Sequence, residues 1–498
     1  MKRSWLKARA LELGIVGVAA VVVAACGSDD DGQVPTPDAS SNGNGNGNGA
    51  DADIPDSVAS VRVVHAASDA PPVDIYVAGV AEPVITELAY GETSDYLEVD
   101  PGAYEFEVRA AGDDASTEPV YTTGAIELAE GARATAIAAG LLSGEGEEAF
   151  RVLALAEDFD EPSAGNAIVR IVHAGADAPT VAIDVGDNGT PDISDLERFA
   201  DTGAAGVELP AGEPLQVAIW AGDPLERVTG FTTPELPEDF ELFVIATGQL
   251  AALPREDTGF GLLAVGPAGS LGFIRQNPTV YALHASPDAP PVDIYAGESV
   301  LVENLAFGEL SAPLQVPPGD YDLDFRAAGS ASDSAPAATA TTPELEAGER
   351  YLATATGFLV RAGADDESFQ LLPAVDDLSL DVDAAAAIRV VHASPDAPPV
   401  DVGTVDAGDI DTVVVSDLAF PDISDEVEIP ASPLVIGVAA TGDTTPVATF
   451  DVELEAADRG FVVAAGALAP GQDEEGFRLI GVLTSEQPWV AVEIAPNQ

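Results

Sequence analysis

Alternating apolar and charged residues predict β-strands in the folded part of this chain. From Tyr104 to Arg109 every second residue is apolar and the residues between are charged, and the segment from Tyr321 to Arg326 repeats this pattern. Period two places one set of side chains on a buried face and the other set in water. Pro-Gly dipeptides precede both segments and predict turns. The stretch 192–200 is the one place where we expect a short turn of helix.

The sequence repeats itself four times. The segment Val61–Asp74 recurs with starts at Val169, Val280 and Ile388. All four histidines occupy one position of the repeat, at intervals of 108, 111 and 108 residues, and a glycine and a phenylalanine keep the same period. The three series are His65, His173, His284 and His392; Gly140, Gly248, Gly357 and Gly466; and Phe150, Phe260, Phe369 and Phe477. The period predicts four structural modules.

Each repeat has the features of a small β-domain. About seven short strands in roughly 100 residues, with turn signals every 8–12 residues, are typical of an immunoglobulin-like sandwich. We therefore predict an all-β protein with four tandem antiparallel β-sandwich (immunoglobulin-like) domains. The predicted domains are 58–160, 166–272, 278–376 and 386–491. The single cysteine excludes an internal disulfide.

The N-terminal residues predict export and lipid anchoring. A basic segment, 2–9, precedes an apolar run, 13–25, that is shorter than the about 20 residues of a transmembrane helix. The run ends in Val-Ala-Ala before Cys26 and resembles a bacterial lipobox. That resemblance implies that 1–25 is a signal peptide and that Cys26 carries the lipid. Residues 26–57, acidic and then alternating Asn and Gly, predict a disordered tether.

Charge narrows the set of partners. The chain has 86 acidic and 19 basic residues, a formal net charge of -67. Such a surface repels phosphates, so we expect no nucleic-acid partner and contact with a membrane through the lipid anchor only. The same composition also fits a surface adapted to high salt, where screening weakens self-repulsion. The alternative is that the charge attracts cations, cationic polymers or basic proteins.

The repeated motif itself resembles a known family. His-Ala-Ser-Pro-Asp-Ala-Pro-Pro-Val-Asp occurs at 284–293 and again at 392–401. It is similar to the signature of a family of prokaryotic extracytoplasmic domains of unknown function, often found in tandem on secreted proteins or lipoproteins. Repeat 2 departs most, with Thr180 and Ala182 replacing Pro and Asp. The resemblance implies surface display and supplies no catalytic residues.

The histidine and aspartate of the motif are the first candidate site. His65, Ser68 and Asp69 suggest a Ser-His-Asp set, but serine stands elsewhere in repeats 3 and 4 and is missing from repeat 2. A catalytic triad requires fixed geometry, so we predict a structural role for the motif residues instead. These residues are His65, Asp69, His173, Asp177, His284, Asp288, His392 and Asp396. One histidine per domain also argues against zinc, which takes three or four clustered ligands.

One loop has the composition of a calcium site. Asp184, Asn188, Asp192 and Asp195 fall at positions 1, 5, 9 and 12 of a loop with Gly189 at position 6. Position 3 is glycine and position 12 is Asp where Glu is usual, so the match is partial. The alternative is a polar β-turn without a metal. We expect no other cofactor.

These features together predict a non-enzymatic lipoprotein of the outer membrane or cell surface. Its modules would serve adhesion, with a polysaccharide or another surface protein as the partner. The first alternative is a scaffold subunit of an envelope assembly without its own ligand site. The second is an extracytoplasmic hydrolase of unrecognised type.

Overall fold

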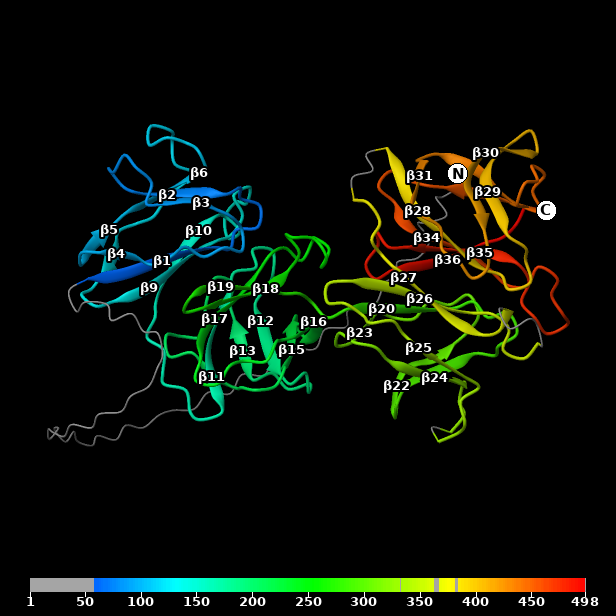
Figure 1. Cartoon of the computed structure of the whole chain (residues 1–498), viewed down its shortest axis with the longest axis horizontal. Coiled ribbons are helices and arrows are strands. Elements are labelled where there is room, and N and C mark those ends of the chain that lie inside the picture. Colours follow the sequence, from blue (N-terminus) through cyan, green and yellow to red (C-terminus); the bar gives the residue numbers. More distant parts are fainter. Residues whose placement is uncertain (1–57, 332, 362–366, 381–383, 498) are drawn as a thin grey trace, which may run out of the picture.

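Four consecutive sets of strands, which we call modules 1 to 4, make up the described part of the chain. The computed structural model describes residues 58–331, 333–361, 367–380 and 384–497, and these residues form thirty-six strands and no α-helix (Figure 1). Within these ranges no helix is long and apolar enough to span a membrane. The all-β prediction is confirmed, and the short helix expected at 192–200 is wrong, because Ile193–Leu196 forms a strand, β13.

The strands of the four modules follow in chain order. Module 1 holds β1 (Ala59–His65), β2 (Val73–Val77), β3 (Ile85–Leu88), β4 (Leu97–Val99), β5 (Gly102–Tyr104), β6 (Phe106–Ala110), β7 (Tyr121–Thr122), β8 (Ile126–Leu128), β9 (Arg133–Ala139) and β10 (Arg151–Ala156). Module 2 holds β11 (Asn166–His173), β12 (Val181–Val185), β13, β14 (Val207–Pro210), β15 (Gln216–Ala221), β16 (Glu226–Thr232), β17 (Glu241–Thr247), β18 (Gly261–Gly266) and β19 (Gly269–Ile274). Module 3 holds β20 (Thr279–His284), β21 (Val292–Ala296), β22 (Ser299–Leu305), β23 (Leu314–Gln315), β24 (Asp322–Ala327), β25 (Ala338–Thr341), β26 (Arg350–Thr356) and β27 (Gln370–Val375). Module 4 holds β28 (Ala385–Ala393), β29 (Val400–Asp406), β30 (Asp409–Leu418), β31 (Val427–Pro430), β32 (Pro433–Ala440), β33 (Ala448–Glu453), β34 (Arg459–Ala465), β35 (Arg478–Leu483) and β36 (Val490–Ile494).

Each module is a sandwich of two sheets. The inner sheet contains the first strand of the module, with the orders β10-β9-β1-β4, β14-β11-β17-β18-β19, β23-β20-β26-β27 and β31-β28-β34-β35-β36. The outer sheet contains the second strand, with the orders β3-β2-β6-β7, β13-β12-β15-β16, β22-β21-β24-β25 and β30-β29-β32-β33. Module 1 adds the small pair β5-β8. The predicted tandem sandwich is therefore confirmed.

One strand pair in each inner sheet is parallel. β1 runs parallel to β9, and the same holds for β11 with β17, β20 with β26 and β28 with β34, whereas the neighbouring pairs are antiparallel. Period-two patterning predicts which side chains are buried but not which distant strand is the partner. The sheets are consequently mixed, where the sequence pattern predicted antiparallel sheets throughout.

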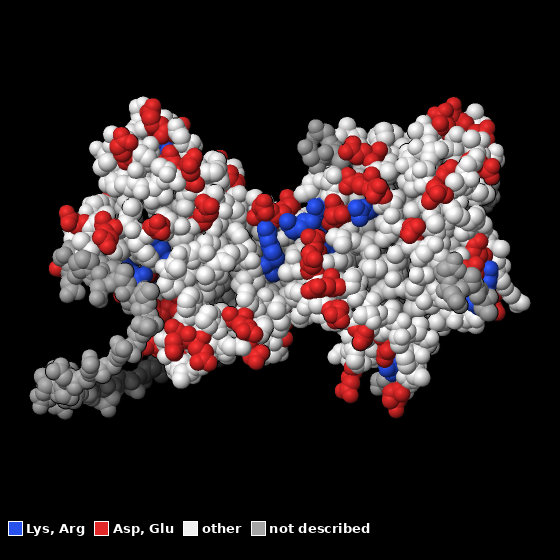
Figure 2. Space-filling model, in the orientation of Figure 1, with Lys and Arg blue, Asp and Glu red and all other residues white. Residues whose placement is uncertain are grey.

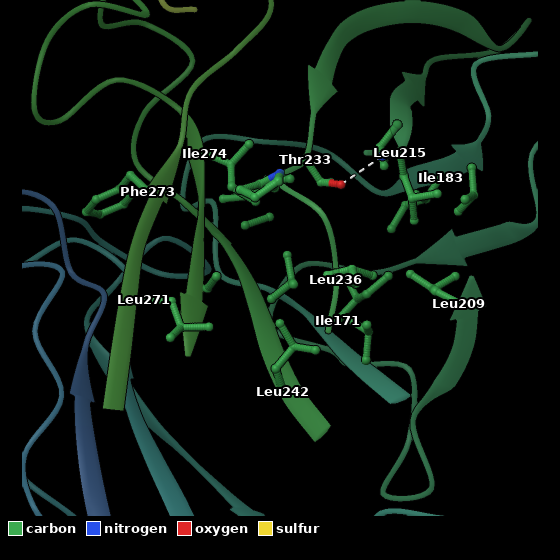
Figure 3. Close-up of a pocket in the computed structure, with 18 of the residues that line it drawn as sticks. Ile171, Ile183, Leu209, Leu215, Thr233, Leu236, Leu242, Leu271, Phe273 and Ile274 are labelled. Carbon is green, nitrogen blue, oxygen red and sulfur yellow. Dashed lines mark hydrogen bonds between the residues drawn. The ribbon is translucent and has the colours of Figure 1, made fainter. Parts of the chain in front are cut away.

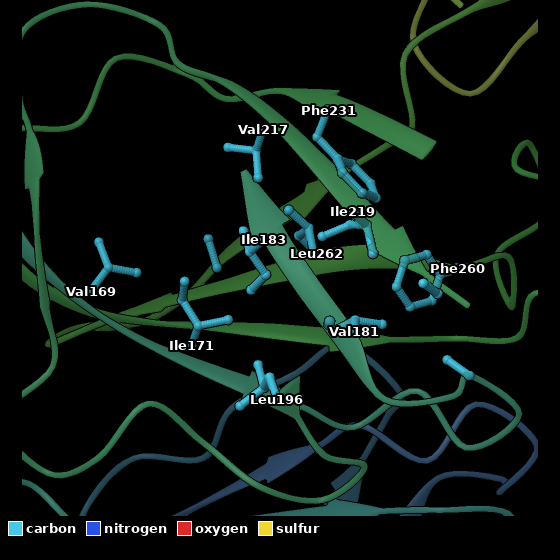
Figure 4. Packing of buried hydrophobic residues seen from close by; sticks show 14 of the residues in the cluster. Val169, Ile171, Val181, Ile183, Leu196, Val217, Ile219, Phe231, Phe260 and Leu262 are labelled. Carbon is cyan, nitrogen blue, oxygen red and sulfur yellow. The ribbon is translucent and has the colours of Figure 1, made fainter. Parts of the chain in front are cut away.

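The space between the two sheets holds the first core of each module. In module 2, Val169 and Ile171 of β11 face Ile183 of β12, and Val217 and Ile219 of β15 complete the cluster (Figure 4). Equivalent clusters fill modules 1, 3 and 4. This packing explains the alternation, because only every second residue of these strands faces the other sheet.

The second face of each inner sheet is also buried, against a neighbouring module. Val64 and Ile137 of module 1 pack on Val172, Phe243 and Leu263 of module 2. The inner sheets of modules 3 and 4 form a corresponding cluster. Modules 1 and 2 therefore make one pair and modules 3 and 4 another, each with its two inner sheets in contact (Figure 1).

Polar contacts cross the interface between modules 1 and 2 in a reciprocal way. The Arg62 guanidinium of module 1 donates to the Gly266 carbonyl of module 2 at 2.6 Å, and Arg170 of module 2 donates to the Ala156 carbonyl of module 1 at 2.6 Å. Buried guanidinium groups need such acceptors, because an unpaired buried charge is costly. Arg62 and Arg170 stand at the same position of the repeat, three residues before the histidine.

At the interface between modules 3 and 4 an aromatic stack takes the place of one of these arginines. Tyr281 of module 3 stands where modules 1 and 2 have the arginine, and its ring stacks on Trp489 of module 4 with centroids 4.3 Å apart. A hydroxyl crosses both interfaces: Thr356 donates to the Ala393 carbonyl, as Thr247 does to the Ala66 carbonyl in the first pair.

The two pairs meet through polar contacts between modules 2 and 3. Arg227 Nη1 and the Gly230 amide donate to the Gln315 side chain at 2.8 and 2.6 Å, and Arg255 donates to the Leu378 carbonyl. Figure 2 shows acidic side chains scattered over the visible face of all four modules, whereas most of the visible basic atoms lie near this junction. Several of the few arginines therefore form contacts between the two pairs of modules.

We expect Phe243→Ala to destabilise modules 1 and 2 together. Phe243 is fully buried in the cluster between them, and its ring meets Phe159 edge-on at 5.2 Å. Loss of such a ring costs about 3–5 kcal/mol in free energy of unfolding. Urea unfolding measures this cost. Val360→Ala, at a side chain that is 75% exposed, is the control and should stay within about 0.5 kcal/mol of wild type.

Candidate functional site

The motif histidine lies at the same buried place in every module. It lies at or next to the end of the first strand, and its Nε2 lies 3.2, 2.8, 3.2 and 3.3 Å from the carbonyl oxygen of the proline six residues later. A carbonyl can only accept, so Nε2 carries the proton of the neutral ring. Burial lowers the pKa of all four histidines. The residues are His65, His173, His284 and His392.

The motif aspartate fixes a distant loop. In module 1 the two carboxylate oxygens of Asp69 accept from the amides of Leu142 and Ser143 at 2.7 and 2.8 Å. Burial alone would raise the pKa of Asp69, but hydrogen bonds from the Ser143 hydroxyl and from the two amides lower it. The aspartates of the other modules accept from the equivalent amides. These residues are Asp177, Asp288 and Asp396.

The repeated glycine permits the start of that loop. Gly357 has a φ of 83°, and a Cβ there would overlap the Ser368 carbonyl. Gly140, Gly248 and Gly466 have the same positive φ and the same close carbonyl. Glycine is the residue that tolerates both conditions. The histidine, the aspartate and the glycine therefore act together to hold one loop geometry.

The Ser-His-Asp set of module 1 does not form a relay. Ser68 accepts from the side-chain amide of Gln249 of module 2 at 3.2 Å, and His65 and Asp69 bond to the groups described above. In modules 3 and 4, Ser286 and Ser394 donate to the carbonyls of the repeated glycines at 2.6 Å. These contacts favour the structural interpretation of the motif.

The last aspartate of the motif has a role that the sequence did not reveal. Asp74 accepts from the amides of Glu87 and Gly112 at 2.8 and 2.9 Å, which ties the irregular part of β3 and the turn after β6 to β2. Asp293 and Asp401 do the same in modules 3 and 4. Module 2 has Ala182 at this position. The repeated Val-Asp dipeptide was the available signal, but its partners are distant in sequence.

The loop predicted to bind calcium uses its oxygens on its own backbone. Asp184 is fully buried and accepts from the amides of Asn188 and Gly189 at 3.1 and 2.7 Å. Asp192 accepts from the Val185 amide, and Asp195 lies at positive φ. Nowhere in the described ranges do three His, Cys, Asp or Glu side chains form a group that could hold a metal. Calcium binding stays a prediction, and these contacts favour the turn interpretation.

Two predicted features lie outside the described residues. These are the signal peptide with Cys26, and the tether 26–57.

Replacing the repeated glycine should lower the free energy of unfolding by more than the strain of a positive φ alone would. We expect Gly357→Ala to lower the free energy of unfolding by clearly more than Gly329→Ala. Both glycines have positive φ, 83° and 74°, but a Cβ at Gly329 meets nothing within 4 Å. The control therefore carries only the strain of about 1–2 kcal/mol for a left-handed residue. Equal losses in urea unfolding would contradict the steric role of the Ser368 carbonyl.

Acid should remove the stability that the neutral histidines contribute. The pKa of His284 in the folded state is lowered from 6.5, so below that pH the unfolded chain binds the extra proton. The contribution is present above the unfolded pKa and is lost as pH falls below it. We expect the stability difference between wild type and His284→Gln to shrink between pH 7.5 and 5.5, by at most about 1.4 kcal/mol per pH unit. Urea unfolding at both pH values measures it, and an unchanged difference would contradict the neutral ring.

Comparison with known proteins places the modules in a family. The family model described as "Domain of unknown function (DUF4397)" matches residues 59–184, 278–403 and 386–479, more than half of the chain. Residues 185–277, most of module 2, lie outside the matched segments. No curated protein matches the chain.

One solved structure is similar over a long stretch at low identity. It is described as the Bacillus anthracis TIE protein, with 10% identity and a TM-score of 0.13. The similarity covers 78% of this chain and 65% of that chain.

The family model matches three tandem segments that together make up more than half of the chain. The chain therefore belongs to the DUF4397 family of domains of unknown function.

Proposed function

We propose that this protein is a non-enzymatic lipoprotein of the cell envelope that displays its modules for contact with other surfaces. The main support for the proposal is that the motif side chains are engaged in hydrogen bonds to the backbone. In all four modules the histidine and the first aspartate are bonded to backbone groups of their own module. The repeated polar residues therefore serve to build a module that is used several times.

The pairing of the modules supports a display role. Because the inner sheets cover one another, each pair is a block of four stacked sheets with outer sheets and loops facing outward. Such blocks space binding surfaces more rigidly than single domains on flexible linkers would. The acidic surface favours neutral or basic partners, such as uncharged polysaccharides or basic patches of surface proteins.

Lipid attachment should depend on Cys26. We expect the chain to incorporate an alkyne-labelled fatty acid in bacterial cells and to sediment with the membranes. Cys26→Ser should abolish the label and move the chain to the soluble fraction, because the thiol is the acceptor of the lipid. Label or membrane sedimentation that persists in Cys26→Ser would contradict lipid anchoring at this residue.

The same variant distinguishes adhesion from scaffolding. The purified full chain with Cys26→Ser can be applied to polysaccharide arrays and to intact cells. Saturable binding supports adhesion. Absence of binding on both surfaces would overturn adhesion and favour the scaffold alternative.

A further inference from the structure

Module 2 differs from its relatives in the space between its sheets. A cavity of about 310 Å³ lies there, lined by side chains of both sheets such as Ile171, Ile183 and Leu242 (Figure 3). The corresponding spaces in modules 3 and 1 are about 50 and 20 Å³. The cavity is therefore a property of this module and not of the fold.

Three interior positions carry aromatic rings in modules 1 and 3 but not in module 2. The strand that pairs with the second strand of each module places two residues at equivalent registers, and a third lies two residues earlier in the chain. They are Tyr104, Phe106 and Val108 in module 1; Tyr321, Leu323 and Phe325 in module 3; and Leu215, Val217 and Ile219 in module 2. Module 4 also lacks rings there, with Leu434, Ile436 and Val438, so the missing rings leave room for the cavity but are not its whole cause.

The cavity reaches solvent beside a short acidic segment. Pro234, Glu235 and Pro237 line it and are exposed, and Leu236 points inward from between them (Figure 3). The nearby Thr233 hydroxyl accepts from the Leu215 amide at 3.0 Å, so this polar group is already satisfied. The rest of the lining is almost entirely aliphatic and aromatic.

We propose that module 2 binds one small uncharged apolar molecule, a hydrocarbon chain or aromatic ring system, between its two sheets. The volume is about twice that of an engineered 150 Å³ cavity that binds benzene, and it lies at the lower end of the range of about 300–1,000 Å³ for ligand pockets. This inference goes beyond surface display and does not depend on it.

The mouth of the cavity selects against anions. Glu235 lines the opening, and Glu238 and Asp239 follow it in exposed positions. A carboxylate or phosphate head group would lie near these charges, which disfavours fatty acids relative to alcohols of the same chain length. The ligand class is therefore apolar and uncharged.

The binding test uses a neutral fluorescent probe. The full chain with Cys26→Ser is titrated with N-phenyl-1-naphthylamine, and the probe is then displaced with 1-dodecanol or dodecanoate. We expect one saturable site, displaced at least tenfold more readily by 1-dodecanol. Val217→Phe introduces the ring that module 1 carries at this register and should weaken probe binding at least tenfold. Val228→Phe, at an exposed side chain of β16, is the matched control and should bind as wild type. Wild-type binding by Val217→Phe would overturn the proposal.

A second variant keeps the test decisive if Val217→Phe does not fold. Glu235→Lys changes an exposed side chain at the mouth. It should strengthen displacement by dodecanoate several-fold and leave 1-dodecanol unchanged. If Glu235→Lys leaves both competitors unchanged, the ligand does not enter beside Glu235 and the proposal fails.

Discussion

Burial of the inner sheet on both faces is the constraint on which the architecture depends. All seven residues of β1 are buried, which a strand with one face in water would not show. One face packs in its own sandwich and the other packs on the next module. An isolated module would expose an apolar sheet face of the kind that soluble monomers avoid. The modules therefore occur as pairs, and the pair is the unit of stability.

The paired arrangement also explains where the arginines lie. In a chain with 86 acidic residues the basic side chains are scarce, and Arg62 and Arg170 are buried where two modules meet. Each guanidinium pairs with a carboxylate of its own module, Glu157 or Asp201, and donates a further hydrogen bond to a carbonyl of the opposite module. In modules 3 and 4 the stack of Tyr281 on Trp489 fills the interface with apolar area. The buried Arg350 of module 3 also donates to the Thr484 carbonyl of module 4 at 3.3 Å, so both interfaces combine apolar contacts with a guanidinium on a carbonyl of the opposite module.

Much of the fold could be predicted from the sequence, because the period of the repeats and the alternation of apolar residues are local signals. A structural role for His65 and Asp69 is a prediction from the sequence, since the serine near them changes place between repeats, and their hydrogen bonds favour it. Their partners could not, because Leu142 and Ser143 are more than seventy residues away. The pairing of modules could not be predicted from the sequence for a similar reason. The run Val61–Ala66 predicts a buried strand, but it does not show that a second module covers one face.

Comparison of the four modules distinguishes the residues that are the same in all of them from those that differ. The histidine, the aspartate and the glycine fix one loop geometry in every module, and this leaves the interior positions of β15 and its counterparts without a backbone role. In module 2 none of these positions carries a ring, and the packing missing around a space of about 310 Å³ lowers the stability of the sandwich. A module on its own would lose much of its stability by such a change. The inner sheet of module 2 packs on that of module 1, and Phe243 and Leu263, which are buried there, do not line the cavity. Packing against module 1 therefore stabilises module 2 and compensates for the cavity between its sheets.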